Sequence, residues 1–390
     1  FLNQSICVLD VSRTLGNGPW KTFWKVALPL ARPAIIAGLS LALMETLADY
    51  GTVQFFGVST FTTGIFRTWF GMGSAAAAAQ LAAGLMVFVF ALVLIERYSR
   101  RKARYHHTSR RHQDLRRFPL TGGRAFLAFL FCLFILGLGF LLPALQLLSW
   151  TIHVADTVID AEFLRLLVNS LSLAAFAAVL ALLLALVMAY AQRLYPGKLV
   201  SGAVQVAGMG YAVPGAVIAV GVMIPFAWID NTIDDLARSQ FNYSTGLLLS
   251  GTLVAVTFAY LTRFLAVSLQ TVDSGLTRIT HSMDEAGRSF GFRPLQILRQ
   301  IHIPMLSASL MTALLLVFVD VLKELPATLI LRPFNFNTLA VKAYELASDE
   351  RLAEAAPAAL AIVIAGIIPV ILLSKTITRS RKLKLAIDEN

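Results

Sequence analysis

Long apolar stretches separated by short polar connections recur along the whole chain. A helix needs roughly 20 consecutive apolar residues to cross a hydrocarbon core about 30 Å thick. The pattern reaches this length eight times, in residues 32–56, 75–96, 125–150, 166–192, 201–229, 245–271, 305–331 and 356–377. Composition agrees, because 57% of the residues are hydrophobic and only 14% are charged. The sequence therefore predicts an all-α, polytopic bundle of about eight transmembrane helices.

The positions of the basic residues decide what the net charge of +11 means. Of the 33 Lys and Arg residues, 25 fall in alternate connections between the predicted spans, whereas the opposite connections hold six. The basic connections are 10–32, 97–124, 193–198, 272–304 and the tail from Lys375. Membrane proteins concentrate Lys and Arg on the cytoplasmic side. We therefore place these connections in the cytoplasm, in reach of membrane lipid, and expect no nucleic acid partner.

One segment occurs twice, at Asp10 to Pro29 and at Glu285 to Pro304, with every matched position 275 residues apart. The match continues beyond the segment and pairs Glu45 with Asp320, Asp49 with Glu324, Phe61 with Phe336, Thr63 with Thr338, and Arg67 with Lys342. An even number of predicted spans, six, separates the copies. Both copies should therefore emerge on the same side of the membrane, as in a parallel repeat.

The repeat predicts three parts of the chain. Residues 1–96 form the end of a first repeat with two spans, 97–123 form a basic cytoplasmic linker, and 124–390 form a second repeat with six spans. Four spans precede the second copy of the segment but only nine residues precede the first, so we expect a full-length protein of twelve spans. The linker histidines, His106, His107 and His112, are candidate metal ligands, but a solvated linker fits its polar composition better.

Each copy has the pattern of two short helices joined at a glycine. The second copy reads EAGRSFGFRPLQILRQIHIP and the first reads DVSRTLGNGPWKTFWKVALP. Glycine permits the turn, and Pro19 and Pro294 suit the first turn of the following helix. The pattern resembles the cytoplasmic loop of the integral-membrane subunits of bacterial ABC importers. The residues that carry the resemblance are Asp10, Gly16, Leu28 and Pro29 in the first copy, and Glu285, Ala286, Gly291, Ile301 and Pro304 in the second.

This resemblance implies the type I ABC importer permease fold in a bacterial cytoplasmic (inner) membrane. It also implies two copies of a separate ATPase subunit, which dock on the two coupling loops, and a periplasmic or extracellular substrate-binding protein. The chain has no G-x-x-x-x-G-K-[ST] phosphate-binding loop. We therefore expect a transport subunit rather than an enzyme, with no cofactor of its own and with ATP bound by the partner. Two ordinary amphipathic connections are the alternative, which the repeated spacing disfavours.

The segments that follow the loops bear on the cargo. Residues 41–56 and 316–340 resemble the ferric-iron branch of these permeases. Importers of thiamine, polyamines or other small solutes share the loop and remain alternatives. A secondary transporter driven by an ion gradient, with intramembrane acids as a proton relay, is an alternative of a different class.

Four acids at predicted membrane depth are candidates for the substrate pathway: Glu45, Asp49, Asp320 and Glu324. Within each repeat the two acids are four residues apart, so a helix places them on one face. Ferric iron is a hard ion that favours oxygen ligands, which suits weak contacts with these carboxylates. We assign no firm metal site. Alternatively, the acids pair with nearby bases such as Lys323.

Overall fold

The computed structural model describes residues 6–101 and 120–388, and the regular elements in these ranges are helices. The first part contains α1 (Ile6–Thr14), α2 (Pro19–Thr22), α3 (Leu28–Ala48), α4 (Gly51–Phe55), α5 (Phe61–Phe66) and α6 (Ala75–Arg101). Next come α7 (Gly122–Leu136), α8 (Leu142–Val158), α9 (Ala161–Leu194), α10 (Lys198–Ala207), α11 (Gly215–Phe241) and α12 (Leu253–Leu276). The last are α13 (His281–Ser289), α14 (Pro294–Ile297), α15 (Ile303–Leu322), α16 (Pro326–Leu331), α17 (Leu339–Ser348) and α18 (Leu352–Asp388).

The described residues group into two compact units. The first unit is drawn from residues 1–47 and 85–143, and the second from 48–84 and 144–390. These units follow contacts in space, whereas the predicted parts 1–96, 97–123 and 124–390 follow the repeat along the sequence. The division into repeats therefore stays a prediction. The three linker histidines lie outside the described residues.

Within the described ranges, seven helical stretches are long and apolar enough to cross a membrane. They are Ala75–Ile95, Gly122–Val158, Ala161–Leu194, Gly215–Phe241, Leu253–Leu276, Pro294–Leu322 and Leu352–Ile371. Pro19–Arg32 and Ala34–Ala48 make an eighth if this pair, bent by 60°, is one span. The prediction of a polytopic all-α bundle is confirmed.

Several predicted spans differ in their bounds from the helices. Helix α3 ends at Ala48 rather than residue 56, and α15 ends at Leu322 rather than residue 331. The predicted span 201–229 is divided between α10 and α11, because the chain turns at Gly210–Ala212 and is extended at Pro214. A Cβ on Gly210 would lie 1.7 Å from the carbonyl oxygen of Thr262, so the turn packs directly on the backbone of α12.

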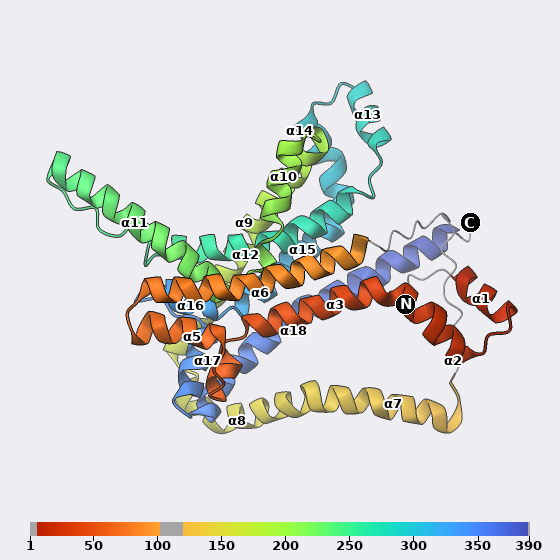
Figure 1. Cartoon of the computed structure of the whole chain (residues 1–390), viewed down its shortest axis with the longest axis horizontal. Coiled ribbons are helices and arrows are strands. Elements are labelled where there is room, and N and C mark those ends of the chain that lie inside the picture. The colour runs from red at the N-terminus through yellow and green to blue at the C-terminus, as the bar shows by residue number, and fades with distance from the viewer. Residues whose placement is uncertain (1–5, 102–119, 389–390) are drawn as a thin grey trace. The chain divides into compact units, whose positions relative to one another are not determined.

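The core of the second unit lies where α9, α12 and α15 pack on one another. Helix α9 presents a stripe of buried alanines, Ala174, Ala177, Ala178, Ala181, Ala185 and Ala189. Small side chains let membrane helices approach closely. Helices α12 and α15 approach at Gly275, where a Cβ would lie 2.7 Å from both Leu306 and Ser309. Beyond the end of this packed trio lie α13 and α14 (Figure 1).

The second unit also contains a segment that the sequence assigns to the first repeat. Tyr50, between α3 and α4, stacks on Phe66 with ring centroids 3.7 Å apart. Its hydroxyl lies 2.8 Å from the hydroxyl of Tyr344 on α17. Residues 48–84 and the second repeat are therefore joined by direct side-chain contacts.

Candidate functional site: two coupling loops and an acidic pathway

The second candidate loop has a sharp turn at its glycine. Helix α13 ends at Ser289, and Gly291 has φ +79°, a conformation that glycine adopts without steric cost. The amide of Gly291 donates to Arg288 O at 2.9 Å, and the amide of Phe292 donates to Gly287 O at 3.1 Å. This pair of bonds is the Schellman arrangement that closes a helix. Pro294 then opens α14.

The first candidate loop has the same backbone geometry. Gly16 has φ +78°. Its amide donates to Arg13 O at 2.9 Å, and the amide of Asn17 donates to Ser12 O at 3.2 Å. In both loops a short π-helical segment follows at matched positions, Phe23–Ala27 in one and Leu298–His302 in the other. The turn predicted at each glycine is present, and the repeat extends to details of backbone conformation.

Each loop exposes large apolar side chains at matched positions. Beside the glycine, Leu15 is 75% exposed and its match Phe290 is 80% exposed. On the short helix that follows, Trp20 is 77% exposed and its match Leu295 is 72% exposed. Clustered apolar side chains in water mark contact surfaces. The loops thus present equivalent apolar surfaces.

The residues that carry the family resemblance take different positions in the loops. Asp10 and Glu285 are exposed, and Asp10 lies 3.9 Å from Arg13. Ala286, Pro29 and Pro304 are also exposed, whereas Leu28 and Ile301 are half-buried. The exposed residues are accessible to a partner. Their role in coupling is not tested by this geometry and stays a prediction.

Packing behind the turn differs between the loops. In the second loop, Gly287 lies against Ile297, whose Cγ1 would be 3.1 Å from an added Cβ. In the first loop the matched pair is Ser12 and Thr22, whose hydroxyls lie 3.1 Å apart. A polar contact in one copy thus replaces an apolar contact in the other, while the turn is retained.

The second loop also contains a buried charged cluster that the sequence did not reveal. Asp284 on α13 accepts a hydrogen bond from Arg193 Nε at 2.8 Å and another from His302 Nε2 at 2.6 Å. Burial favours the neutral carboxyl, but the bonds from Arg193 and His302 outweigh it and hold the pKa of Asp284 below its usual value. Because the ionised carboxylate has no proton to donate, His302 donates from Nε2. Its buried Nδ1 has no hydrogen-bond partner.

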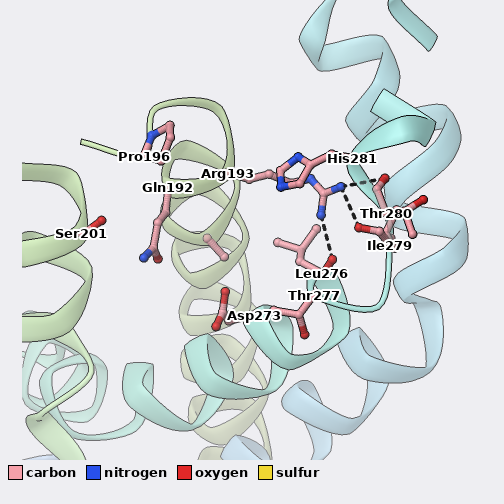
Figure 2. A pocket seen from close by; sticks show the side chains of 11 residues that line it. Gln192, Arg193, Pro196, Ser201, Asp273, Leu276, Thr277, Ile279, Thr280 and His281 are labelled. Atoms are coloured by element: carbon pink, nitrogen blue, oxygen red, sulfur yellow. Dashed lines mark hydrogen bonds between the residues drawn. The ribbon is translucent and has the colours of Figure 1, made fainter. Parts of the chain in front are cut away.

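Arg193 joins the loop to two long helices. It stands near the end of α9, and its guanidinium also donates to Leu276 O at 2.7 Å and Ile279 O at 2.9 Å. These carbonyls lie at and just beyond the end of α12, where backbone acceptors lack helical partners. Figure 2 shows Arg193 reaching across to them along the wall of a pocket of about 470 Å³. Gln192, Ser201 and Asp273 also line this pocket.

Two of the four candidate pathway acids accept hydrogen bonds from amides in the first turn of short helices. Glu324 Oε1 accepts from Ala327 N at 3.1 Å, at the start of α16. Asp49 Oδ1 accepts from Thr52 N at 3.3 Å, at the start of α4. The two bonds lie at matched positions, because Glu324 and Ala327 correspond to Asp49 and Thr52. They explain why α3 and α15 stop earlier than predicted, since each acid favours a new helix start.

Glu324 is bound more tightly than its match Asp49. Its carboxylate also accepts from Thr328 N at 3.1 Å and from Thr328 Oγ1 at 2.9 Å. It forms a buried ion pair with Arg263 of α12 at 3.1 Å. A Cβ on Gly215 would lie 2.4 Å from Glu324 Oε1, so α11 closes over this pair.

The other two acids are more accessible. Asp320 is half-buried and lies 3.1 Å from Lys323, the base named in the alternative interpretation, while Glu45 is exposed. Among the described residues, no group of three or more His, Cys, Asp or Glu side chains is placed to hold a metal ion. The pathway role of all four acids stays a prediction.

A polytopic helical bundle with two matched loops is the architecture expected of a membrane permease. The family model described as "Binding-protein-dependent transport system inner membrane component" matches residues 8–105 and 181–383. The chain belongs to this family of ABC importer permeases and is a multi-pass inner membrane protein. The predicted family is therefore confirmed, and each matched segment contains one of the two loops.

One relative matches most of the chain, and others match shorter parts of it. The chain is 30% identical over 375 residues to the "Fe(3+)-transport system permease protein FbpB 2" of Haemophilus influenzae, which covers 94% of this chain and 70% of the relative. It is 28% identical over 201 residues to the "Putative 2-aminoethylphosphonate transport system permease protein PhnV" of Salmonella typhimurium, covering 52% and 69%. The "Molybdenum transport system permease protein ModB" of Azotobacter vinelandii is 38% identical over 100 residues, covering 24% and 43%.

The fold is also similar to a solved transporter chain. In the crystal structure of a bacterial alginate ABC transporter in complex with a periplasmic protein bound to an alginate pentasaccharide, one chain matches with a TM-score of 0.50 at 14% identity. The match covers 66% of this chain and 94% of that chain. It confirms the fold of an ABC transporter permease.

Proposed function

We propose that this chain is the permease through which ferric iron crosses the cytoplasmic membrane in a binding-protein-dependent importer. The observation that supports this cargo is the similarity to a ferric-iron permease over 94% of the chain. The relatives named for molybdenum and 2-aminoethylphosphonate match 24% and 52% of the chain. Ferric iron is the substrate here and not a resident cofactor.

In this proposal the energy comes from two ATPase subunits, one at each loop, which bind and hydrolyse ATP. The chain itself has no phosphate-binding loop motif and acts as a transport subunit rather than an enzyme. The exposed residues Leu15 and Trp20 in the first loop, and Phe290 and Leu295 in the second, supply equivalent apolar anchors for the two subunits. Basic connections contact anionic lipid headgroups on the same side.

An external binding protein delivers the iron to the opposite face. Along the pathway, the exposed Glu45 and half-buried Asp320 make weak contacts with the ion, while Asp49 and Glu324 shape the backbone. Weak contacts suit transport, since tight ligation by several carboxylates opposes release.

Reconstituted uptake tests the proposal. The transporter assembled with its ATPase subunits is placed in liposomes, and a binding protein presents radiolabelled ferric iron, thiamine or spermidine in separate trials. We expect ATP to drive accumulation of ferric iron above that of the other two solutes. Accumulation of thiamine or spermidine without iron would overturn the cargo. Iron uptake that follows a proton gradient and needs no ATPase would overturn the mechanism.

A further inference from the structure

The two coupling loops differ in how they are held, although their backbones match. In the second loop, Asp284 and His302 form a buried pair with Arg193. The matched positions in the first loop are Leu9 and Ala27, whose side chains neither donate nor accept hydrogen bonds. The first loop therefore cannot form this cluster.

The cluster joins parts of the chain that are far apart in sequence. Arg193 belongs to α9, Asp284 to α13, and His302 to the π-helical segment that leads into α15. A second contact lies beside it, because Tyr190 of α9 donates to Pro294 O at 2.5 Å and packs edge-on against His302. Helix α9 is thus fixed to both short helices of the second loop.

The contact resists bending as well as separation. The guanidinium fork of Arg193 is planar, and it bonds Asp284 on one side and the backbone at Leu276 and Ile279 on another. Its side chain is 8% exposed, so water does not replace these partners. A push on α13 is therefore transmitted to α9 and α12 together. The pocket separates Arg193 from Ser201 of α10 (Figure 2), so Arg193 does not fix α10 as it fixes α13.

We propose that Arg193 is a positioning residue for energy coupling, and that it transmits the movement of the second loop to α9 through Asp284 and His302. The two loops are consequently unequal: the second drives the transmembrane helices through a rigid charged contact, and the first does so without it. This inference deepens the proposed function, since it rests on ATP-driven transport by this chain.

The variant that isolates this role is Arg193→Met combined with Asp284→Leu and His302→Ala. The last two changes give the second loop the residues of the first. All three together leave no buried charge unpaired, and apolar replacement of a complete buried ion cluster is often neutral for stability. Arg193→Met alone leaves Asp284 without its cation and should instead reduce the amount of folded protein.

The measurement is the number of ferric ions transported per ATP hydrolysed in liposomes that contain the complete transporter. We expect the triple variant to retain its ATPase subunits and to hydrolyse ATP, but to transport at least about fivefold fewer ions per ATP. Because both rates scale with the amount of assembled transporter, a purely structural role leaves their ratio unchanged. Arg238→Met, which removes the exposed partner of the half-buried Asp234 near the end of α11, is the control and should keep the wild-type ratio.

A wild-type ratio in the triple variant would overturn the inference. That result differs from failure of the proposed function, in which the unmodified transporter itself fails to import ferric iron with ATP.

Discussion

Replacing Glu324 by Gln separates a structural role for this acid from a role in the cargo pathway. The change keeps the shape of the side chain but removes its charge. Glu324 is 4% exposed, so water cannot satisfy the groups that lose a partner. Arg263 would then face a neutral amide, with its guanidinium already 3.1 Å from the position of Oε1.

The magnitude follows from the bonds that the amide cannot accept. If the amide nitrogen takes the place of Oε2, the bond from Thr328 N is lost, the Thr328 hydroxyl must turn to accept from the amide, and the bond from Arg263 loses its charged acceptor. Hydrogen bonds to charged groups contribute roughly 1.5–3 kcal/mol each, and breaking a buried ion pair costs about 3–5 kcal/mol. Since these terms overlap, we expect Glu324→Gln to lower the free energy of unfolding by about 3–5 kcal/mol.

The assay is thermal unfolding of the purified transporter in detergent, with Asp49→Asn as the matched control. Asp49 is half-buried and its side chain accepts one bond, from Thr52 N at 3.3 Å. Asp49→Asn should therefore lower the free energy of unfolding by about 1 kcal/mol or less. Replacing Arg263 by Met together with Glu324→Gln should recover part of the loss, because the unpaired cation is removed. If Glu324→Gln instead unfolds like Asp49→Asn but abolishes uptake, Glu324 belongs to the pathway and the structural role is refuted.

Further predictions address packing, the pathway and pH. Gly210→Ala would place a methyl group against the backbone oxygen of Thr262, which cannot move aside. We expect the free energy of unfolding to fall by about 3 kcal/mol or more, which should lower the amount of folded protein recovered in detergent. Gly287→Ala meets the side chains of Ile297 and Ile301 at 3.1–3.3 Å, which need to shift only slightly, and it gains roughly 1 kcal/mol of helix propensity. Its unfolding temperature should therefore stay near wild type, and a collapse like that of Gly210→Ala would refute the packing described. Glu45→Gln with Asp320→Asn should lower ferric iron uptake while the ATPase subunits stay bound, and full transport by this variant would remove both acids from the pathway. Because the folded-state pKa of Asp284 is below the ordinary value of 3.8, its pairing stabilises the fold above that pH and is lost as the pH falls through the lower, folded-state value; unfolding followed between pH 5 and 2 should show less acid loss in Asp284→Asn than in wild type.

The features that the sequence predicted correctly are local or periodic. Apolar runs reveal membrane helices because each run must satisfy its own backbone hydrogen bonds in lipid. The turns at Gly16 and Gly291 were predictable because glycine favours a positive φ and proline favours the first turn of a helix, so both signals lie within a few residues. The repeat then supplied an independent check, since the same spacing occurs twice.

The features that the sequence did not predict depend on partners far along the chain. Nothing near Arg193 indicates that it pairs with Asp284, 91 positions away. Hydropathy also placed the ends of the spans that contain α3 and α15 too far along the chain, because hydropathy counts apolar residues and does not detect hydrogen bonds to helix ends. Asp49 and Glu324 were interpreted first as pathway residues for the same reason: a carboxylate at membrane depth is conspicuous, whereas the amide groups it caps are invisible in sequence.

Association with the ATPase subunits depends, in this proposal, on the exposed apolar side chains of both loops. Trp20→Ala and Leu295→Ala remove the matched exposed side chains of the two loops, while Phe241→Ala removes an equally exposed ring at the end of α11 as a control. Truncating an anchor residue of an interface costs about 2 kcal/mol or more, which is roughly 30-fold in affinity. We expect each loop variant to weaken binding of the ATPase subunit by about that factor, measured by titration in detergent, and Phe241→Ala to bind as wild type does. Wild-type affinity in the double variant Trp20→Ala with Leu295→Ala would contradict the assignment of these loops as the sites where ATP-driven movement enters the permease.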